Sequence, residues 1–199
     1  MTTVVLMGPP GAGKGTHAGM LADRFAVPAI STGDIFRAQV AAGTDLGRTA
    51  QQYVDSGAYV PDEVTNAMVR ERLSADDTRP GFLLDGYPRT LDQAAVLDEV
   101  LGTQDRRLTA VLVLSVDREA LVRRLLRRAE IQHRSDDTED VIRRRLEVYS
   151  EHTLPLIELN GDRRLVHEID GNGDVDEVRE RILEFAYKLT PAERSAPGA

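Results

Sequence analysis

Near its amino terminus the chain contains Met7-Gly8-Pro9-Pro10-Gly11-Ala12-Gly13-Lys14-Gly15-Thr16, a glycine-rich stretch. A short apolar run, residues 3–7, leads into it, and an amphipathic segment with Leu21 and Phe25 on one side follows it. This order predicts a strand, a loop and a helix. Glycines let successive backbone N–H groups turn inward at the start of a helix, where they bind phosphate oxygens. Lys14 would add a mobile positive charge for the outer phosphates.

The spacing of this stretch matches the phosphate-binding loop (P-loop) signature G-x-x-x-x-G-K, with one departure. Gly15 follows the lysine, and the hydroxyl residue Thr16 comes one position later than usual. A glycine turn that merely joins a strand to a helix is the alternative, and it explains neither the length nor the placement of the motif. Lys14 and Lys188 are also the only lysines in a chain that otherwise uses arginine. That choice suggests a position that needs a compact ammonium group.

Composition excludes several classes of protein. The chain has 199 residues, enough for one core with small inserted lobes, and a net charge of −8. The negative charge argues against binding to nucleic acid or to a membrane surface. The absence of cysteine excludes disulfides and thiolate zinc sites. We find neither a signal peptide nor a long apolar segment, so the expected location is the cytoplasm.

Short apolar runs alternate with helical patterns along the chain. They predict strands at 3–7, 82–84, 110–114 and 165–169, with a weaker candidate at 28–30. Continuous hydrophobicity is typical of strands covered on both faces. The expected fold is therefore α/β: a three-layer P-loop fold with a five-stranded parallel sheet flanked by helices. Ligands bind such sheets at the carboxyl ends of the strands.

Two stretches interrupt this alternation. Residues 32–60 contain helical patterns but no strand, which suggests a small helical lobe. Residues 123–134 are rich in arginine and poor in apolar positions, which suggests a short flap. Two insertions at the mouth of a phosphate site are typical of elements that close over substrates and exclude water.

The strand expected at 82–84 ends in an acid and a turn. Asp85 stands where P-loop enzymes keep a carboxylate near magnesium, although a turn cap would also explain it. Gly86 and Pro88 turn the chain, and Arg89 would then project back over the strand ends. Because a guanidinium binds two phosphate oxygens at once, Arg89 is a candidate phosphate clamp.

Further arginines lie on two other segments. Arg37 falls in the opening turns of a helix that Thr32 and Asp34 are suited to cap. Arg124 and Arg128 are four residues apart and share a helix face. Arg145 lies within an apolar helical stripe, and a buried charge needs a partner, either a carboxylate or a phosphate.

This set of cations exceeds what storage of a nucleotide requires. Phosphoryl transfer depends mainly on positioning and on stabilising negative charge. A kinase whose acceptor is itself a phosphate needs extra cations and no general base, because its nucleophile is already ionised. The histidines show no metal-ligand spacing and are interpreted as structural or surface residues: His17, His133, His152 and His167.

The sequence resembles one family, the adenylate kinases among the nucleoside monophosphate kinases. The matching motifs run in family order over nearly the whole chain, and the Gly15-Thr16 departure is the family's own form. They are residues 8–16, Ser31-Thr32-Gly33-Asp34, Val60-Pro61-Asp62-Glu63, residues 81–90 with Gln93, Arg134 with Asp136-Asp137, and Arg145-Leu146-Glu147.

The resemblance implies reversible transfer from Mg-ATP to AMP, giving two ADP, and thereby adenine nucleotide homeostasis. It implies ATP contacts from Gly11, Ala12, Gly13, Lys14, Gly15, Thr16, Arg128 and the backbone of Gly173. It implies AMP contacts from Thr32, Arg37, Ala58, Tyr59, Val60, Gly86, Tyr87, Pro88, Arg89, Gln93, Arg134 and Arg145. It assigns direct roles in the transfer to Lys14, Arg89, Arg124, Arg134 and Arg145.

The resemblance also implies the organisation of the chain. A core of residues 1–30, 61–127 and 138–190 would carry an NMP-binding lobe, 31–60, and a short lid, 128–137. Asp85 would bind Mg²⁺ through water, and the short lid would carry no zinc. The protein would be a monomer with ATP, AMP and ADP as its partners, and we expect a disordered tail at 191–199.

Two alternatives stay open at this point. A UMP/CMP kinase shares the short lid, but Thr32, Thr90 and Gln93 favour AMP, because a hydroxyl and an amide can hydrogen-bond an adenine edge. The chain could also be a nucleotide-binding regulatory module without transfer activity, although the arginines that match the family's motifs are all present.

Overall fold

The structure is a computed structural model, and it describes residues 1–132 and 138–189. Its centre is a five-stranded sheet in the order β2-β3-β1-β4-β5, in which every neighbouring pair is parallel. The strands are β1 (Thr2–Met7), β2 (Ala29–Ser31), β3 (Gly81–Asp85), β4 (Ala110–Ser115) and β5 (Val166–Asp170). The predicted α/β class and the five-stranded parallel sheet are confirmed. The weakest predicted strand exists, shifted by one residue so that it ends on Ser31.

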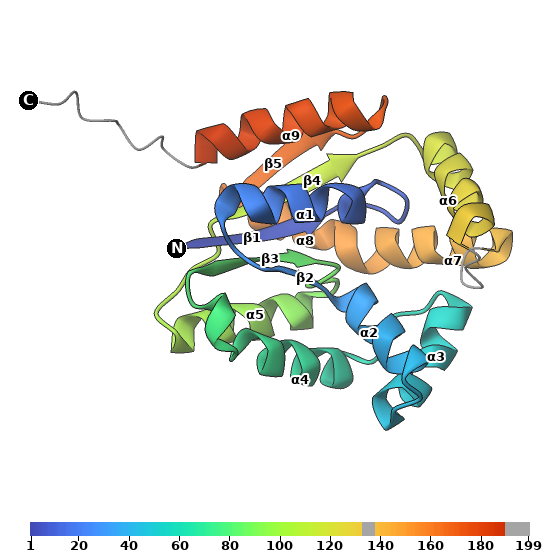
Figure 1. The fold of residues 1–199 in the computed structure, drawn as a ribbon, viewed down its shortest axis with the longest axis horizontal. Helices are drawn as coiled ribbons and strands as arrows, with labels where there is room; N and C mark the ends of the chain where they lie inside the picture. Colours follow the sequence, from blue (N-terminus) through green and yellow to red (C-terminus); the bar gives the residue numbers. More distant parts are fainter. Residues whose placement is uncertain (133–137, 190–199) are drawn as a thin grey trace, which may run out of the picture.

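Helices cover both faces of this sheet (Figure 1). They are α1 (Lys14–Phe25), α2 (Thr32–Ala41), α3 (Asp45–Ser56), α4 (Asp62–Leu73), α5 (Leu91–Thr103), α6 (Arg118–Gln132), α7 (Glu139–Val148), α8 (Leu154–Asp162) and α9 (Val175–Leu189). A π-helical turn, Tyr149–Thr153, joins α7 to α8.

The pleat of the central strand divides the core into two layers. Val4 and Leu6 of β1 pack with apolar side chains of α1, α6, α7 and α9. Val5 and Met7 pack with those of α2, α4, α5 and α8. Successive side chains of a strand point to opposite faces, so an uninterrupted apolar run is what a doubly covered strand requires.

The helices outside this regular alternation gather at one end of the sheet. Figure 1 shows α2 and α3 projecting beside α6 and α7 at the end where the strands finish. Residues 32–56 are helical, apart from the turn between α2 and α3. The first residues of the expected lid, 128–132, continue α6. Residues 133–137 of that lid, including Arg134, and the tail at 191–199 lie outside the described residues.

Candidate active site

The glycine-rich loop joins β1 to α1 and opens that helix. Gly13 is the N-cap of α1 and has φ of 95°, a left-handed conformation that glycine adopts without strain. Lys14 begins the helix, and its Nζ donates hydrogen bonds to the carbonyl oxygens of Gly8 (2.7 Å) and Pro9 (3.0 Å). The lysine side chain therefore folds back over the glycine-rich loop, at the N-terminus of α1.

The electrostatics of Lys14 show how crowded with charge this region is. The pKa of Lys14 is lowered to about 8, chiefly by burial and to a smaller extent by repulsion from Arg89, Arg145 and Arg128. The carboxylate of Asp85, at the end of β3, acts in the opposite direction. Burial in turn raises the pKa of Asp85, against the attraction of Lys14 and Arg89. A bound polyphosphate would favour the charged form of Lys14, because it would supply negative charge beside the ammonium group, whereas a cation would be needed to favour the ionised form of Asp85.

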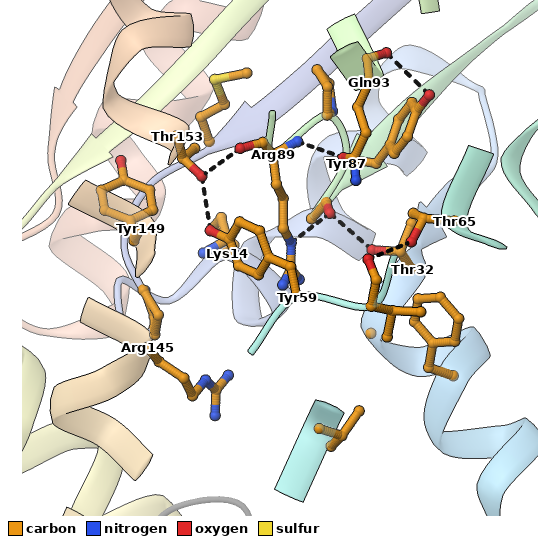
Figure 2. A pocket seen from close by; sticks show the side chains of 18 of the residues that line it. Lys14, Thr32, Tyr59, Thr65, Tyr87, Arg89, Gln93, Arg145, Tyr149 and Thr153 are labelled. Carbon is orange, nitrogen blue, oxygen red and sulfur yellow. Dashed lines mark hydrogen bonds between the residues drawn. The ribbon is translucent and has the colours of Figure 1, made fainter. Parts of the chain in front are cut away.

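Arg89 is held from several sides in the turn after β3. Its backbone N–H donates to Gln93 Oε1 (2.7 Å), and its Nε donates to the carbonyl of Gly86 (2.7 Å). The carbonyl of Arg89 accepts from the hydroxyl of Thr153 (3.0 Å). The guanidinium carbon lies 5.0 Å from the ring centroid of Tyr59, a cation–π distance. Figure 2 shows this side chain at the centre of the network.

Gly86 makes this arrangement possible. Its φ is +82°, and a Cβ there would lie 2.8 Å from Arg89 Nη2 and 2.9 Å from Thr32 Oγ1. The Gly86 carbonyl also accepts a hydrogen bond from the Thr32 hydroxyl (2.9 Å), which connects the start of α2 to this turn. The Tyr87–Pro88 peptide bond that follows is cis.

Two cavities meet at these residues. The first is enclosed by α2, the end of α3, the turn after β3 and the π-helical turn, and Figure 2 looks into it. Its lining includes Thr32, Ala58, Tyr59, Val60, Tyr87, Pro88, Gln93, Tyr149 and Thr153.

The second cavity extends from the glycine-rich loop toward α6 and the loop after β5. Its lining includes Gly11, Ala12, Gly13, Gly15, Thr16, Asp85, Arg124, Arg128 and Gly173. The charged residues that line both cavities are all cations: Lys14, Arg37, Arg89 and Arg145. Every predicted site residue within the described part of the chain thus lines at least one of the two cavities.

The arginines on α2 and α6 have partners of their own. Arg37 pairs with Asp34, three residues earlier in α2, and its side chain is 43% exposed. Arg124 Nη2 donates to the carbonyl oxygens of Gly171 (3.0 Å) and Gly173 (3.1 Å). Arg124 therefore ties α6 to the loop after β5, while Gly173 faces the same cavity with its backbone.

Several side chains that complete the first cavity carry no recognisable signal in the sequence. Thr153 and Tyr149 belong to the π-helical turn, for which the sequence carries no periodic signal. Burial raises the pKa of the Tyr149 phenol to about 12, so this hydroxyl stays neutral. Gly57, with φ of +73°, lets the lobe approach α7 closely, because a Cβ there would lie 2.9 Å from Arg145 Cγ. The one signal in the sequence for Gly57 is the frequent occurrence of glycine where a helix ends, and Gly57 does follow the last residue of α3.

This fold and site define a class, the P-loop nucleoside monophosphate kinases. One cavity lies at the glycine loop, the other lies beside it, and the cations that line both stand between them. The comparisons give the particular family. A family model described as adenylate kinase matches residues 6–164. The chain belongs to the adenylate kinase family, as the resemblance of the motifs predicted.

Curated relatives support this over nearly their whole length. An adenylate kinase of Nocardioides sp. strain JS614 is 58% identical over 181 residues, 91% of this chain and 95% of the relative. One of Thermobifida fusca strain YX is 56% identical over 180 residues, 90% and 95% of the two chains. One of Micrococcus luteus is 49% identical over 197 residues, 99% and 96% of the two chains. The alternative of a UMP/CMP kinase finds no support among these relatives.

Proposed function

We propose that the protein catalyses reversible phosphoryl transfer from Mg-ATP to AMP, giving two ADP. One observation carries the proposal beyond the family likeness: two cavities share a border of cations, Lys14, Arg37, Arg89 and Arg145. Two anionic substrates that must react repel each other, and cations between them offset that repulsion. A storage or regulatory module for one nucleotide would need only the second cavity.

ATP would occupy the second cavity. Backbone N–H groups of residues 11–16 would bind its phosphates at the start of α1, where the helix dipole also favours anions. Lys14 would exchange its bonds to the Gly8 and Pro9 carbonyls for the transferred phosphoryl group. Arg124 and Arg128 would flank the phosphates from α6, and the backbone at Gly173 would meet the adenine.

AMP would occupy the first cavity. Arg37, Arg89 and Arg145 would bind its phosphate, and the acceptor oxygen would need no general base because it is ionised at neutral pH. Thr32, Gln93 and the backbone of residues 58–60 would surround the base, and residues 86–88 would form the floor of the site. Arg134 belongs to the same motif set, but it lies outside the described residues and supports nothing here.

Magnesium would be held at Asp85. Mg²⁺ bound to nucleotides keeps several waters and uses one or two carboxylates, and Asp85 offers one carboxylate at the border of the second cavity. Burial raises the pKa of Asp85, and a bound cation would favour the ionised form of this carboxylate. Held there by Asp85, a magnesium ion would supply positive charge that offsets the negative charge of the ATP phosphates.

The remaining expectations depend on the family likeness. We propose a core of residues 1–30, 61–127 and 138–190, a lobe of 31–60 and a short lid of 128–137. A monomer in the cytoplasm accords with the proposed small-molecule partners. In the described residues we find no helix long and apolar enough to cross a membrane.

A panel of phosphate acceptors tests the proposed function. Mg-ATP would be supplied with AMP, CMP, UMP or GMP, and ADP formation would be followed for each. A strong preference for AMP is the expected result. Equal or better use of CMP or UMP would retain the two-cavity mechanism but overturn the assignment of the base. Nucleotide binding without transfer to any acceptor would make the protein a regulatory module.

A further inference from the structure

A carboxylate behind the first cavity connects its walls. Asp62 is the first residue of α4, immediately after the lobe. Its Oδ1 accepts a hydrogen bond from Gln93 Nε2 (2.6 Å), and its Oδ2 accepts from the Thr90 hydroxyl (2.6 Å). Both bonds are charge-assisted and short, so they are among the stronger hydrogen bonds in the molecule.

These contacts determine which way the Gln93 amide points. Gln93 Oε1 accepts from the backbone N–H of Arg89 (2.7 Å), a group that can only donate. The carboxylate of Asp62 can only accept. Rotating the amide by half a turn would place N–H against N–H and oxygen against oxygen. Because Gln93 is only 1% exposed, water could not relieve those conflicts.

The contacts that fix the Gln93 amide, which we call the lock, also include Thr90. Its hydroxyl donates to Asp62 and accepts from the backbone N–H of Gln93 (3.2 Å), which caps α5. The carboxylate is thus fixed at both oxygens, and its position at the start of α4 is favoured by the helix dipole. The amide, the carboxylate and the cap form one unit that holds Arg89 by its backbone.

We propose that Asp62 is a specificity-determining residue that reads no base itself but fixes the orientation of the amide that does. The inference rests on the proposed function, in which Gln93 faces the base of AMP. An amide has two N–H groups and two carbonyl lone pairs. One N–H of Gln93 bonds to Asp62 and one lone pair accepts from Arg89, so one N–H and one lone pair are left for the base. In a locked amide, their order in space is fixed.

That order distinguishes bases of the same shape. Adenine carries an amino donor beside a ring nitrogen acceptor, whereas hypoxanthine carries a carbonyl acceptor beside an N–H donor. A locked amide is complementary to one of these patterns and leaves buried polar groups unpaired against the other, which sites of this kind penalise strongly. An amide free to rotate would match either base.

Asp62→Leu tests the lock, because it removes both acceptors, whereas an asparagine could still accept from Gln93 Nε2 and donate to the Thr90 hydroxyl. Turnover would be measured with AMP and with inosine monophosphate, and the readout is the ratio of their kcat/KM values. We expect this ratio to fall by at least about tenfold, the effect of one unpaired buried group. Glu63→Gln is the matched control, since it removes the same charge from the same helix turn at an exposed position and should leave the ratio unchanged.

A charge-conserving swap separates the lock from a loss of stability. In the double variant Asp62→Asn/Gln93→Glu, the asparagine can donate to the new carboxylate, which can still accept from the Arg89 N–H. The melting temperature and kcat with AMP should therefore recover relative to Asp62→Leu. The discrimination should not recover, because residue 93 would then offer only acceptors to either base.

The outcomes are distinguishable from failure of the proposed function. A wild-type protein without preference for AMP in the acceptor panel overturns the proposed function and this inference with it. A wild-type preference for AMP, together with an Asp62→Leu ratio within about twofold of wild type, overturns the inference alone. Recovery of discrimination in the swap would also overturn it, since it would mean that Asp62 acts only on stability.

Discussion

Arg89 and Arg37 lie at the same border between the two cavities, yet the protein holds them differently. Arg89 is fixed through its backbone N–H, its carbonyl, its Nε and the face of its guanidinium by residues of four segments. Arg37 is 43% exposed and pairs with Asp34 of its own helix. One cation is preorganised by the tertiary structure, and the other is provided by a surface helix.

The contrast indicates a division of labour. A charge that is already in place needs no reorganisation when the transferred group becomes more negative, so it can stabilise the transition state strongly. A flexible charge loses conformational entropy on binding and contributes mainly to holding the substrate.

The largest effect is expected for Arg89→Ala. Kcat should fall by roughly a thousandfold or more, as for arginines that stabilise phosphoryl transfer. Steady-state kinetics with saturating Mg-ATP and AMP would measure it. Arg48→Ala is the control, because Arg48 is an exposed arginine of the lobe at 31–60 that pairs with Asp45 and lines neither cavity. A raised KM for AMP with unchanged kcat would reverse the roles assigned to the two arginines.

Arg37→Ala should act mainly on binding of AMP. Loss of a charge-assisted contact is expected to raise the KM for AMP by about 10- to 100-fold. Kcat should stay within about threefold of wild type, because Arg89 remains in place. The same assay separates the two constants. A fall in kcat as large as that of Arg89→Ala would show that exposure does not distinguish their roles.

Lys14, a third cation of the border, predicts a pH dependence of ATP binding. Its lowered pKa, about 8, means that the free protein loses this ammonium charge as the pH rises through that value. ATP affinity should therefore be highest below the pKa and should fall up to about tenfold near pH 9. Calorimetric titrations across this range would detect the decline. Lys14→Arg should abolish it, since arginine stays charged. The same slope in Lys14→Arg would assign the titration elsewhere.

The smallest effect is expected for Thr153→Val, which keeps the shape of the side chain. It removes the bond to the Arg89 carbonyl and the contact with the Tyr59 hydroxyl, 2.8 Å away. We expect kcat/KM to fall about three- to tenfold. Tyr59→Phe keeps the ring over Arg89, so the double variant should be less than additive if the hydroxyls act as a pair.

Thr49→Val provides the control for Thr153→Val. Thr49 is an exposed threonine of the lobe whose hydroxyl bonds to the carbonyl of Asp45. It should leave kcat/KM unchanged. Strict additivity of Thr153→Val and Tyr59→Phe would mean that Arg89 is not positioned through this pair.

The sequence predicted those parts of the site that are local. The glycine loop, Asp85 and Arg89 each follow a buried strand, and apolar runs identify such strands directly. The carboxyl ends of parallel strands meet at one edge, so these residues had to come together. Strand β2 was harder to predict because it has only three residues and takes its register from β3.

The parts that escaped prediction depend on pairs distant in the sequence. Asp62 meets Gln93 across 31 positions, and Tyr59 meets Thr153 across 94. No periodicity encodes such pairs. Gln93 was recognised as a candidate base contact, but its role in holding the Arg89 backbone became visible only in three dimensions.

The row of cations between the cavities has a consequence for the protein without its substrates. Like charges gathered in a partly buried space repel, and the pKa of Lys14 is lowered first by burial and then by repulsion from the neighbouring arginines. The empty enzyme therefore carries an electrostatic strain that any well-placed anion relieves. Its tolerance to heat should depend on the nucleotides around it, so that the pool it interconverts also serves as its stabiliser.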